Sequence, residues 1–189
     1  MASVSTNEVK VGMKVEVDRE PYLIINNEFV KPGKGQAFNR IKMKNMINGR
    51  AVEKTYKSGD KLDLADIEES SVRFLYKEPD GAVFMDEKTF DQTTISNDLI
   101  GQNAQWLMEE VIYHVIFYKG SAIQLEPPTF MEMKVVETSP GVRGDTSGRV
   151  LKPALTETGA KIQIPIFVEE GEKIRVDTRT CEYVSRAND

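Results

Sequence analysis

Short runs of Val, Ile, Tyr, Phe and Thr, each ended by a turn-forming residue, recur along the whole of this chain. In its first part such runs lie at residues 14–17, 22–25 and 37–44, and turn residues at 18–21 and 32–35 separate them. No segment keeps an apolar period of about 3.6 residues long enough for a helical bundle. The pattern therefore predicts an all-β protein built from short strands.

Turn signals and a change in charge divide the 189 residues into three segments of similar length. In the middle segment, Pro79-Asp80-Gly81 joins two apolar runs and predicts a hairpin. Glu126-Pro127-Pro128 interrupts the strand pattern, because proline has no N–H to donate to a strand ladder. Segments of about 60 residues are large enough to fold as small barrels. We therefore predict three domains, residues 1–64, 65–128 and 129–189.

One stretch of the middle segment, residues 97–110, favours helix. It predicts one or two short helical turns with Asn97 as the N-cap. Trp106, Leu107 and Met108 form a large apolar group near its end, which we expect to anchor the helical turns against the barrel.

Charge is unevenly distributed, although the formal net charge is only −5. Residues 1–64 carry twelve Lys and Arg against eight Asp and Glu, a net of +4. Residues 65–128 carry four against twelve, a net of −8, and residues 129–189 carry nine against ten, a net of −1. Because a polyanion repels the acidic part, such a chain is expected to approach it in one orientation, basic end first.

The strand predicted over residues 37–44 concentrates part of this basic charge. A period of two puts its three cations on one face and its apolar residues on the other. The cations are Arg40, Lys42 and Lys44. Such a face can bind phosphates, although on its own it is more simply explained as a solvated cationic surface.

Pro32-Gly33-Lys34-Gly35 joins two predicted strands, so Lys34 should project into solvent from a hairpin tip. The simplest interpretation is a solubilising lysine on a mobile turn. The cationic strand face behind it favours a second interpretation, in which a slim, glycine-flanked lysine enters a narrow space lined by phosphates.

Cys181 is the only cysteine and His114 the only histidine. An internal disulfide and a zinc or iron–sulfur cage are therefore not expected, and most Ser-His-Asp and Cys-His designs are excluded. We expect no metal, no cofactor and no catalytic side chain. Residues 1–10 lack a signal-peptide pattern, and no apolar run approaches the ~20 residues that span a bilayer. A cytoplasmic protein without membrane contact is expected.

Residues 29–38, FVKPGKGQAF, closely resemble the signature loop of bacterial elongation factor P. Further runs that look like the second signature and the C-terminus of that family lie at Lys152-Pro153-Ala154, Gly159, residues 162–168, Gly171, residues 176–179 and residues 182–186. The resemblance thus covers essentially the full length. One departure is Cys181, where relatives usually have glycine in the final turn.

The resemblance implies an SH3-like N-terminal barrel of the KOW type followed by two OB-fold barrels. It also implies a translation elongation factor, not an enzyme, which binds both subunits of the bacterial ribosome between the peptidyl-tRNA and exit sites. Such a factor relieves stalling at consecutive prolines. Hypusine-bearing relatives from eukaryotes and archaea stop after two domains, so the third segment indicates the bacterial form. We expect a monomer.

Roles for single residues follow from the same resemblance. Lys34 matches the position that receives a β-lysyl group from a lysyl-tRNA-synthetase-like enzyme, and its extended side chain would hold the 3′ end of peptidyl-tRNA near the attack geometry. The residues of the loop that supports it are Lys31, Pro32, Gly33 and Gly35. The segment Gly144-Asp145-Thr146 matches the loop that faces the exit-site codon; judged alone, it is a plain barrel connection. Tyr183 and Arg186 are further candidates for RNA contact, although an aromatic near a chain end also suits a core position.

Two other functions remain open on these grounds. OB barrels bind many oligonucleotides, so the chain could be a generic single-stranded RNA-binding protein. It could also be an elongation factor P-like paralogue with a narrower role. The charge of −8 on residues 65–128 disfavours the first alternative, and the intact loop around Lys34 disfavours the second.

Overall fold

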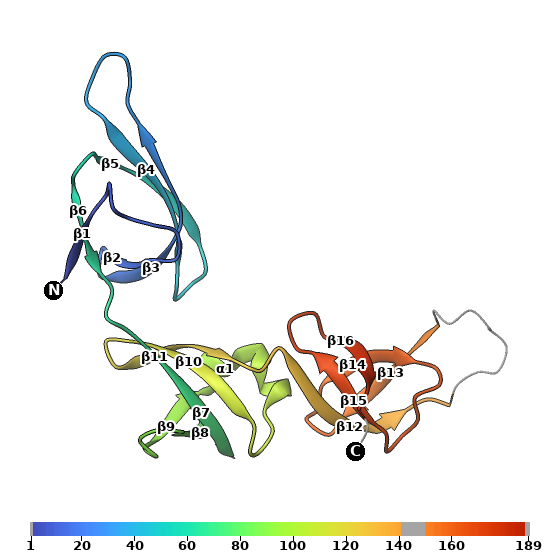
Figure 1. The fold of residues 1–189 in the computed structure, drawn as a ribbon. Helices are drawn as coiled ribbons and strands as arrows, with labels where there is room; N and C mark the ends of the chain where they lie inside the picture. Colours follow the sequence, from blue (N-terminus) through green and yellow to red (C-terminus); the bar gives the residue numbers. More distant parts are fainter. Residues whose placement is uncertain (1, 141–149, 188–189) are drawn as a thin grey trace. The chain divides into compact units, whose positions relative to one another are not determined.

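The computed structural model describes residues 2–140 and 150–187. Nearly all its regular structure is strand, with one helical stretch between β9 and β10 (Figure 1), which confirms the predicted all-β class. The chain packs as two compact units. One unit holds the residues up to Ser70 together with Val115–Gln124, and the other holds Ser71–His114 together with the residues from Leu125 onward.

The first sheet is antiparallel, with strand order β1-β6-β2-β3-β4-β5. Its strands are β1 (Ser3–Ser5), β2 (Lys14–Val17), β3 (Glu20–Val30), β4 (Phe38–Asn45), β5 (Ala51–Lys57) and β6 (Lys61–Leu64). Val15, Ile24, Ile41 and Met43 fill its core. The long strand β3 changes register after Ile24, and beyond this bulge β3 and β4 continue as a hairpin arm past the core.

The second sheet has the order β11-β10-β7-β8-β9. Its strands are β7 (Ile67–Glu78), β8 (Gly81–Asp86), β9 (Gln92–Ser96), β10 (Ile112–Tyr118) and β11 (Ser121–Glu126). The hairpin predicted at Pro79-Asp80-Gly81 is confirmed by the pairing of Glu78 with Gly81. Gly81 cannot carry a side chain, because an added Cβ would lie 2.3 Å from the carbonyl oxygen of Ile95.

Helical turns occupy the predicted stretch as α1 (Asn97–Ile100) and the 3₁₀ turn η1 (Gly101–Trp106). The predicted N-cap was wrong by one residue: the Ser96 hydroxyl accepts a hydrogen bond from the Leu99 amide at 3.4 Å. The Asn97 side chain instead donates to the carbonyl of Pro79 at 2.9 Å. Since serine and asparagine are about equally good N-caps, local propensity did not separate these neighbours.

Trp106 has only 2% of its surface exposed and belongs to the core of the third sheet, beside residues such as Met133 and Ile162. This sheet is a closed barrel with the order β12-β13-β14-β16-β15. Its strands are β12 (Phe130–Thr138), β13 (Leu151–Thr156), β14 (Lys161–Pro165), β15 (Lys173–Asp177) and β16 (Glu182–Arg186). The predicted apolar anchor thus packs into a barrel whose strands come later in the chain. Among the described residues, no helix is both long and apolar enough to cross a bilayer.

Candidate functional site

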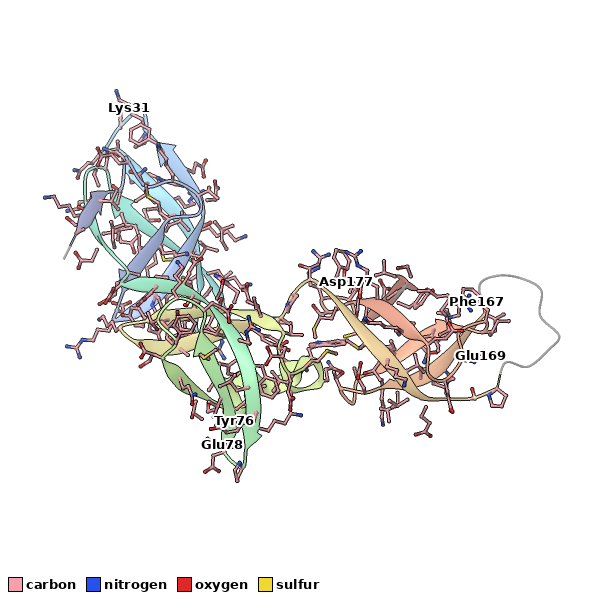
Figure 2. All side chains as sticks on the ribbon, turned by 60° about the horizontal axis from the view of Figure 1, so that its bottom comes forward. Lys31, Tyr76, Glu78, Phe167, Glu169 and Asp177 are labelled. Atoms are coloured by element: carbon pink, nitrogen blue, oxygen red, sulfur yellow. The ribbon has the colours of Figure 1, made fainter. Side chains whose placement is uncertain are left out.

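The arm formed by β3 and β4 carries the Lys34 loop. The two strands pair from Tyr22 with Asn45 up to Val30 with Phe38, and residues 31–37 connect them. Lys34 lies in the middle of this connection and is exposed. Lys31, at its start, marks the end of the arm farthest from the core in Figure 2. The predicted hairpin tip is therefore confirmed as a structural feature.

Two glycines flank Lys34 and differ in what they contribute. Gly35 has a φ of +113°, a conformation that strains any residue with a Cβ. An added Cβ there would lie 3.7 Å from Cγ of Pro32, which is an ordinary contact. Glycine is therefore required by the backbone conformation and not by a lack of space. Gly33 has no such φ, and no atom lies within 4 Å of an added Cβ. Gly35 therefore sets the turn, while Gly33 keeps the tip slim.

Strand β4 alternates as the sequence predicted. Ile41 and Met43 have no exposed surface, and the cations between and beside them point to solvent. These cations are Arg40, Lys42 and Lys44. Arg40 lies 3.6 Å from a carboxylate oxygen of Glu28 and 3.6 Å from one of Glu53. The other two have no ion pair within the described part of the chain, so their charge is available to a partner.

Acidic side chains on neighbouring strands and turns neutralise part of the basic charge of this unit. Glu28 lies on β3, and Asp18, in the turn before β3, holds Nζ of Lys54 at 2.6 Å. That hydrogen bond raises the pKa of Lys54 above its ordinary value. Arg40 and Lys54 therefore have acidic partners in the folded chain, and they offer less free charge to a polyanion than Lys42 and Lys44 do.

A chain of side-chain amides fastens the base of the arm. Asn27 donates through Nδ2 to the carbonyls of Thr6, at 2.8 Å, and Val9, at 2.9 Å. Both donors of Asn27 are then used, so its Oδ1 accepts, and it does so from Asn39 at 3.0 Å. Thr6 in turn donates to the carbonyl of Lys57. These contacts join the N-terminal segment, both arm strands and the end of β5.

Sequence analysis missed this amide network. Asn39 is only 1% exposed and shares the inward face of β4 with Ile41 and Met43. An asparagine at a position where the strand pattern calls for an apolar residue was the one sign of the network in the sequence. Its Oδ1, like the hydroxyl of Tyr56 directly opposite on β5, is buried without a hydrogen-bond partner among the described residues. Such atoms lower stability, so Asn39 is better explained by the attachment of the arm than by core packing.

The third barrel holds the other candidate RNA contacts, in the second compact unit. Tyr183 is half-buried and packs against the barrel core, as the alternative interpretation of this residue expected. Arg186 donates to the carbonyl of Phe167 at 2.8 Å, and its Nε lies 2.9 Å from Glu172. Its guanidinium also stacks on the Phe167 ring, labelled in Figure 2, with 4.9 Å to the centroid. Both side chains therefore have partners within the barrel.

The end of this barrel contains a second strongly held pair. Arg179 forms a hydrogen bond to the carboxylate of Asp177 at 2.8 Å and lowers the pKa of Asp177 to about 2. Cys181, in the turn between β15 and β16, is exposed and has a φ of +58°. Glycine adopts that conformation with the least strain, which explains why relatives usually have glycine at this position.

The predicted codon-facing loop, Gly144-Asp145-Thr146, lies outside the described residues. At the edge of that gap, the largely buried Lys152 donates from Nζ to the carbonyl of Ser139 at 2.9 Å. Within the described ranges, no three His, Cys, Asp or Glu side chains gather closely enough to hold a metal ion.

Solved structures of translation factors share this fold. "Eukaryotic translation initiation factor 5A from Methanococcus jannaschii" is similar with a TM-score of 0.56 and 21% identity, covering 67% of this chain and 92% of that one. A "translation initiation factor eif-5a family protein from Naegleria fowleri" gives 0.54 and 13%, over 66% and 97% of the two chains. At these identities the likeness establishes the fold alone, and it extends over about two thirds of this chain.

Family comparisons define the chain more closely. Residues 5–62 match the KOW-like domain of elongation factor P, residues 67–125 its OB domain and residues 131–186 its C-terminal domain. "Elongation factor P 2" of Protochlamydia amoebophila is 65% identical over all of both chains, and that of Chlamydia caviae is 57% identical over the same extent. The chain belongs to the elongation factor P family and is a translation elongation factor, which confirms the resemblance noted in its sequence.

Proposed function

We propose that this factor binds the bacterial ribosome between the peptidyl-tRNA and exit sites and promotes peptide-bond formation at consecutive prolines. The observation that carries the proposal is Lys34, an exposed lysine at the tip of a fastened hairpin arm, within the signature loop of the family. It has no ion pair among the described residues, so its ammonium group is available to an RNA backbone. Lys31, Pro32, Gly33 and Gly35 support it in this role.

The chemistry requires positioning and no reactive side chain. Proline reacts poorly in peptide transfer, because its ring fixes φ and its secondary amine is sterically confined. The 3′ end of the donor tRNA then samples unproductive geometries. A long cationic side chain along that end reduces this freedom, and positioning of this kind can lower a barrier by several kcal/mol, within a ceiling of about 7–11 kcal/mol. A β-lysyl extension of Lys34, added by a lysyl-tRNA-synthetase-like enzyme, would increase its reach. Peptide transfer itself stays with ribosomal RNA, so the factor is not an enzyme.

The remaining proposed contacts orient the factor on RNA. Arg40, Lys42 and Lys44 on β4 meet phosphates, Tyr183 and Arg186 add contacts on the third barrel, and Gly144-Asp145-Thr146 faces the exit-site codon. The unpaired charge of Lys42 and Lys44 supports the first of these most directly. We further propose domains at residues 1–64, 65–128 and 129–189, a monomeric state and a cytoplasmic location.

A translation assay tests the proposal. Lys34→Ala should abolish rescue of a reporter with consecutive prolines while unfolding with an unchanged midpoint, because exposed tip residues usually change stability by less than ~0.5 kcal/mol. Lys77→Ala, at an exposed lysine of β7, is the matched control and should rescue normally. Intact-mass measurement of protein from its own source gives the modification state. Rescue at the wild-type rate by the Lys34→Ala protein would disprove the role of this residue.

A further inference from the structure

The segment of residues 86–91, which consists of the last residue of β8 and the connection to β9, is unusually well fastened for a surface loop. All six of its backbone N–H groups donate hydrogen bonds within the chain. The amide of Asp86 donates to the carbonyl of Asp91, that of Glu87 to the carbonyl of Ser71, and that of Phe90 to the carbonyl of Asp86. The amides of Lys88 and Thr89 donate to the Asp86 carboxylate. The amide of Asp91 donates to the Thr89 hydroxyl. The loop therefore holds its shape without a partner.

This rigid loop presents Phe90 to solvent. Phe90 is 69% exposed, more than any other large apolar side chain of the described residues. Its φ is +63°, in the left-handed region that an aromatic residue seldom adopts. Single exposed apolar residues are common and need no explanation. Phe90 differs from these residues, because its exposed ring stands on a backbone that is strained and fully hydrogen-bonded. The ring adds nothing to the stability of the fold, whereas binding to a partner would benefit from a side chain that is already held in place.

The surroundings of the ring indicate the charge of its partner. Asp91, the next residue, is exposed and has no ion pair within the described ranges. Glu87 is already paired with the Arg73 guanidinium, at 2.8 Å, so Asp91 is the carboxylate beside the ring that the argument uses. Residues 65–128 as a whole carry a net charge of −8. An aromatic ring could stack on an RNA base, but this field repels a phosphate backbone. It attracts a cationic side chain, which also stacks favourably on an aromatic face.

We propose that Phe90 and Asp91 form an anchor for a basic protein segment, with an arginine or lysine side chain stacked on the ring and paired with the carboxylate. The inference rests on the proposed function in one respect: the segment would belong to a protein of the ribosome. It adds a protein contact, made by the acidic second sheet, to the RNA contacts proposed for the arm.

Binding measurements with purified ribosomes test the anchor. Phe90→Ala should weaken affinity by roughly fivefold to tenfold, the size expected for one stacked cation. Phe90→Gly should weaken it equally while melting at the wild-type temperature or above, since glycine relieves the backbone strain. Tyr76→Ala is the control: Tyr76, labelled in Figure 2, is 49% exposed on β7 of the same sheet and should leave affinity unchanged.

Photocrosslinking identifies the class of partner. Benzoylphenylalanine placed at position 90 should crosslink to a basic segment of a ribosomal protein, and the same group at position 76 should not. Crosslinks only to ribosomal RNA, or wild-type affinity of both Phe90 variants, would overturn the anchor. If the variants bind normally while Lys34→Ala still loses rescue, the anchor alone fails. If the wild-type factor does not bind ribosomes, the proposed function fails with it.

Discussion

Gly35 is the residue on which the shape of the Lys34 loop depends most directly. Its φ of +113° is the one positive φ among residues 31–37. Lys34 is then presented by a backbone geometry that only glycine adopts without strain. The side chain that carries the proposed function and the residue that aims it are thus neighbours.

Replacing each flanking glycine by alanine distinguishes the need for a positive φ from the need for a small side chain. Gly35→Ala should lower rescue of the proline reporter and destabilise the protein by roughly 1 kcal/mol or more, because alanine is strained at positive φ. Gly33→Ala, with open space around its Cβ and no positive φ, should leave stability unchanged and lower rescue less than Gly35→Ala does. Denaturant unfolding and the rescue assay measure both effects. Equal losses in the two variants would show that the tip needs slimness on both sides of Lys34.

At the scale of elements, β4 combines two functions because its side chains alternate between faces. Its inward residues hold the arm on the barrel, through Ile41 and Met43 in the core and Asn39 in the amide network. Its outward residues carry the basic charge. Changes to the outward face should therefore alter binding with little effect on folding.

Charge reversal on that face gives a direct test. The double variant Lys42→Glu with Lys44→Glu should weaken ribosome binding and flatten its dependence on salt, because each lost phosphate contact removes roughly 0.7–0.9 from the log–log slope. Lys77→Glu, on the acidic second sheet, is the control for a change of charge alone. Affinity measured from low to high salt distinguishes them. A slope that stays at the wild-type value in the double variant would argue against phosphate contacts by β4.

At the scale of the whole molecule, Trp106 links consecutive parts of the chain. It ends a helical turn that follows β9, yet it is buried in the core of the barrel formed by β12 to β16. The carbonyl of Trp106 accepts a hydrogen bond from the buried hydroxyl of Tyr113 at 2.6 Å. The third barrel therefore completes its core with a residue from the preceding segment.

Removal of the Trp106 side chain should destabilise the protein far more than its position in a short helical turn implies. Trp106→Ala is expected to lower the free energy of unfolding by roughly 3–5 kcal/mol, the usual loss for a fully buried large aromatic residue. Trp106→Phe should lose less, because much of the apolar volume remains. Circular dichroism during denaturant unfolding measures both. A loss below about 1 kcal/mol in the alanine variant would mean that the barrel core closes without it.

Sequence alone determined the strand class, the Lys34 hairpin and the outward face of β4, because each depends on the local alternation of side chains and on turn residues. The family motifs in the sequence then indicated which family of translation factors the chain belongs to. Tertiary structure decided which distant segments meet: Glu28 and Asp18 beside the basic residues, Asn27 with Asn39 at the base of the arm, and Trp106 inside the third barrel. It also showed that Phe90 stands on a rigid loop. No local period or turn signal encodes these contacts, because they depend on the pairing register of the strands and on the packing of segments that are separated along the chain.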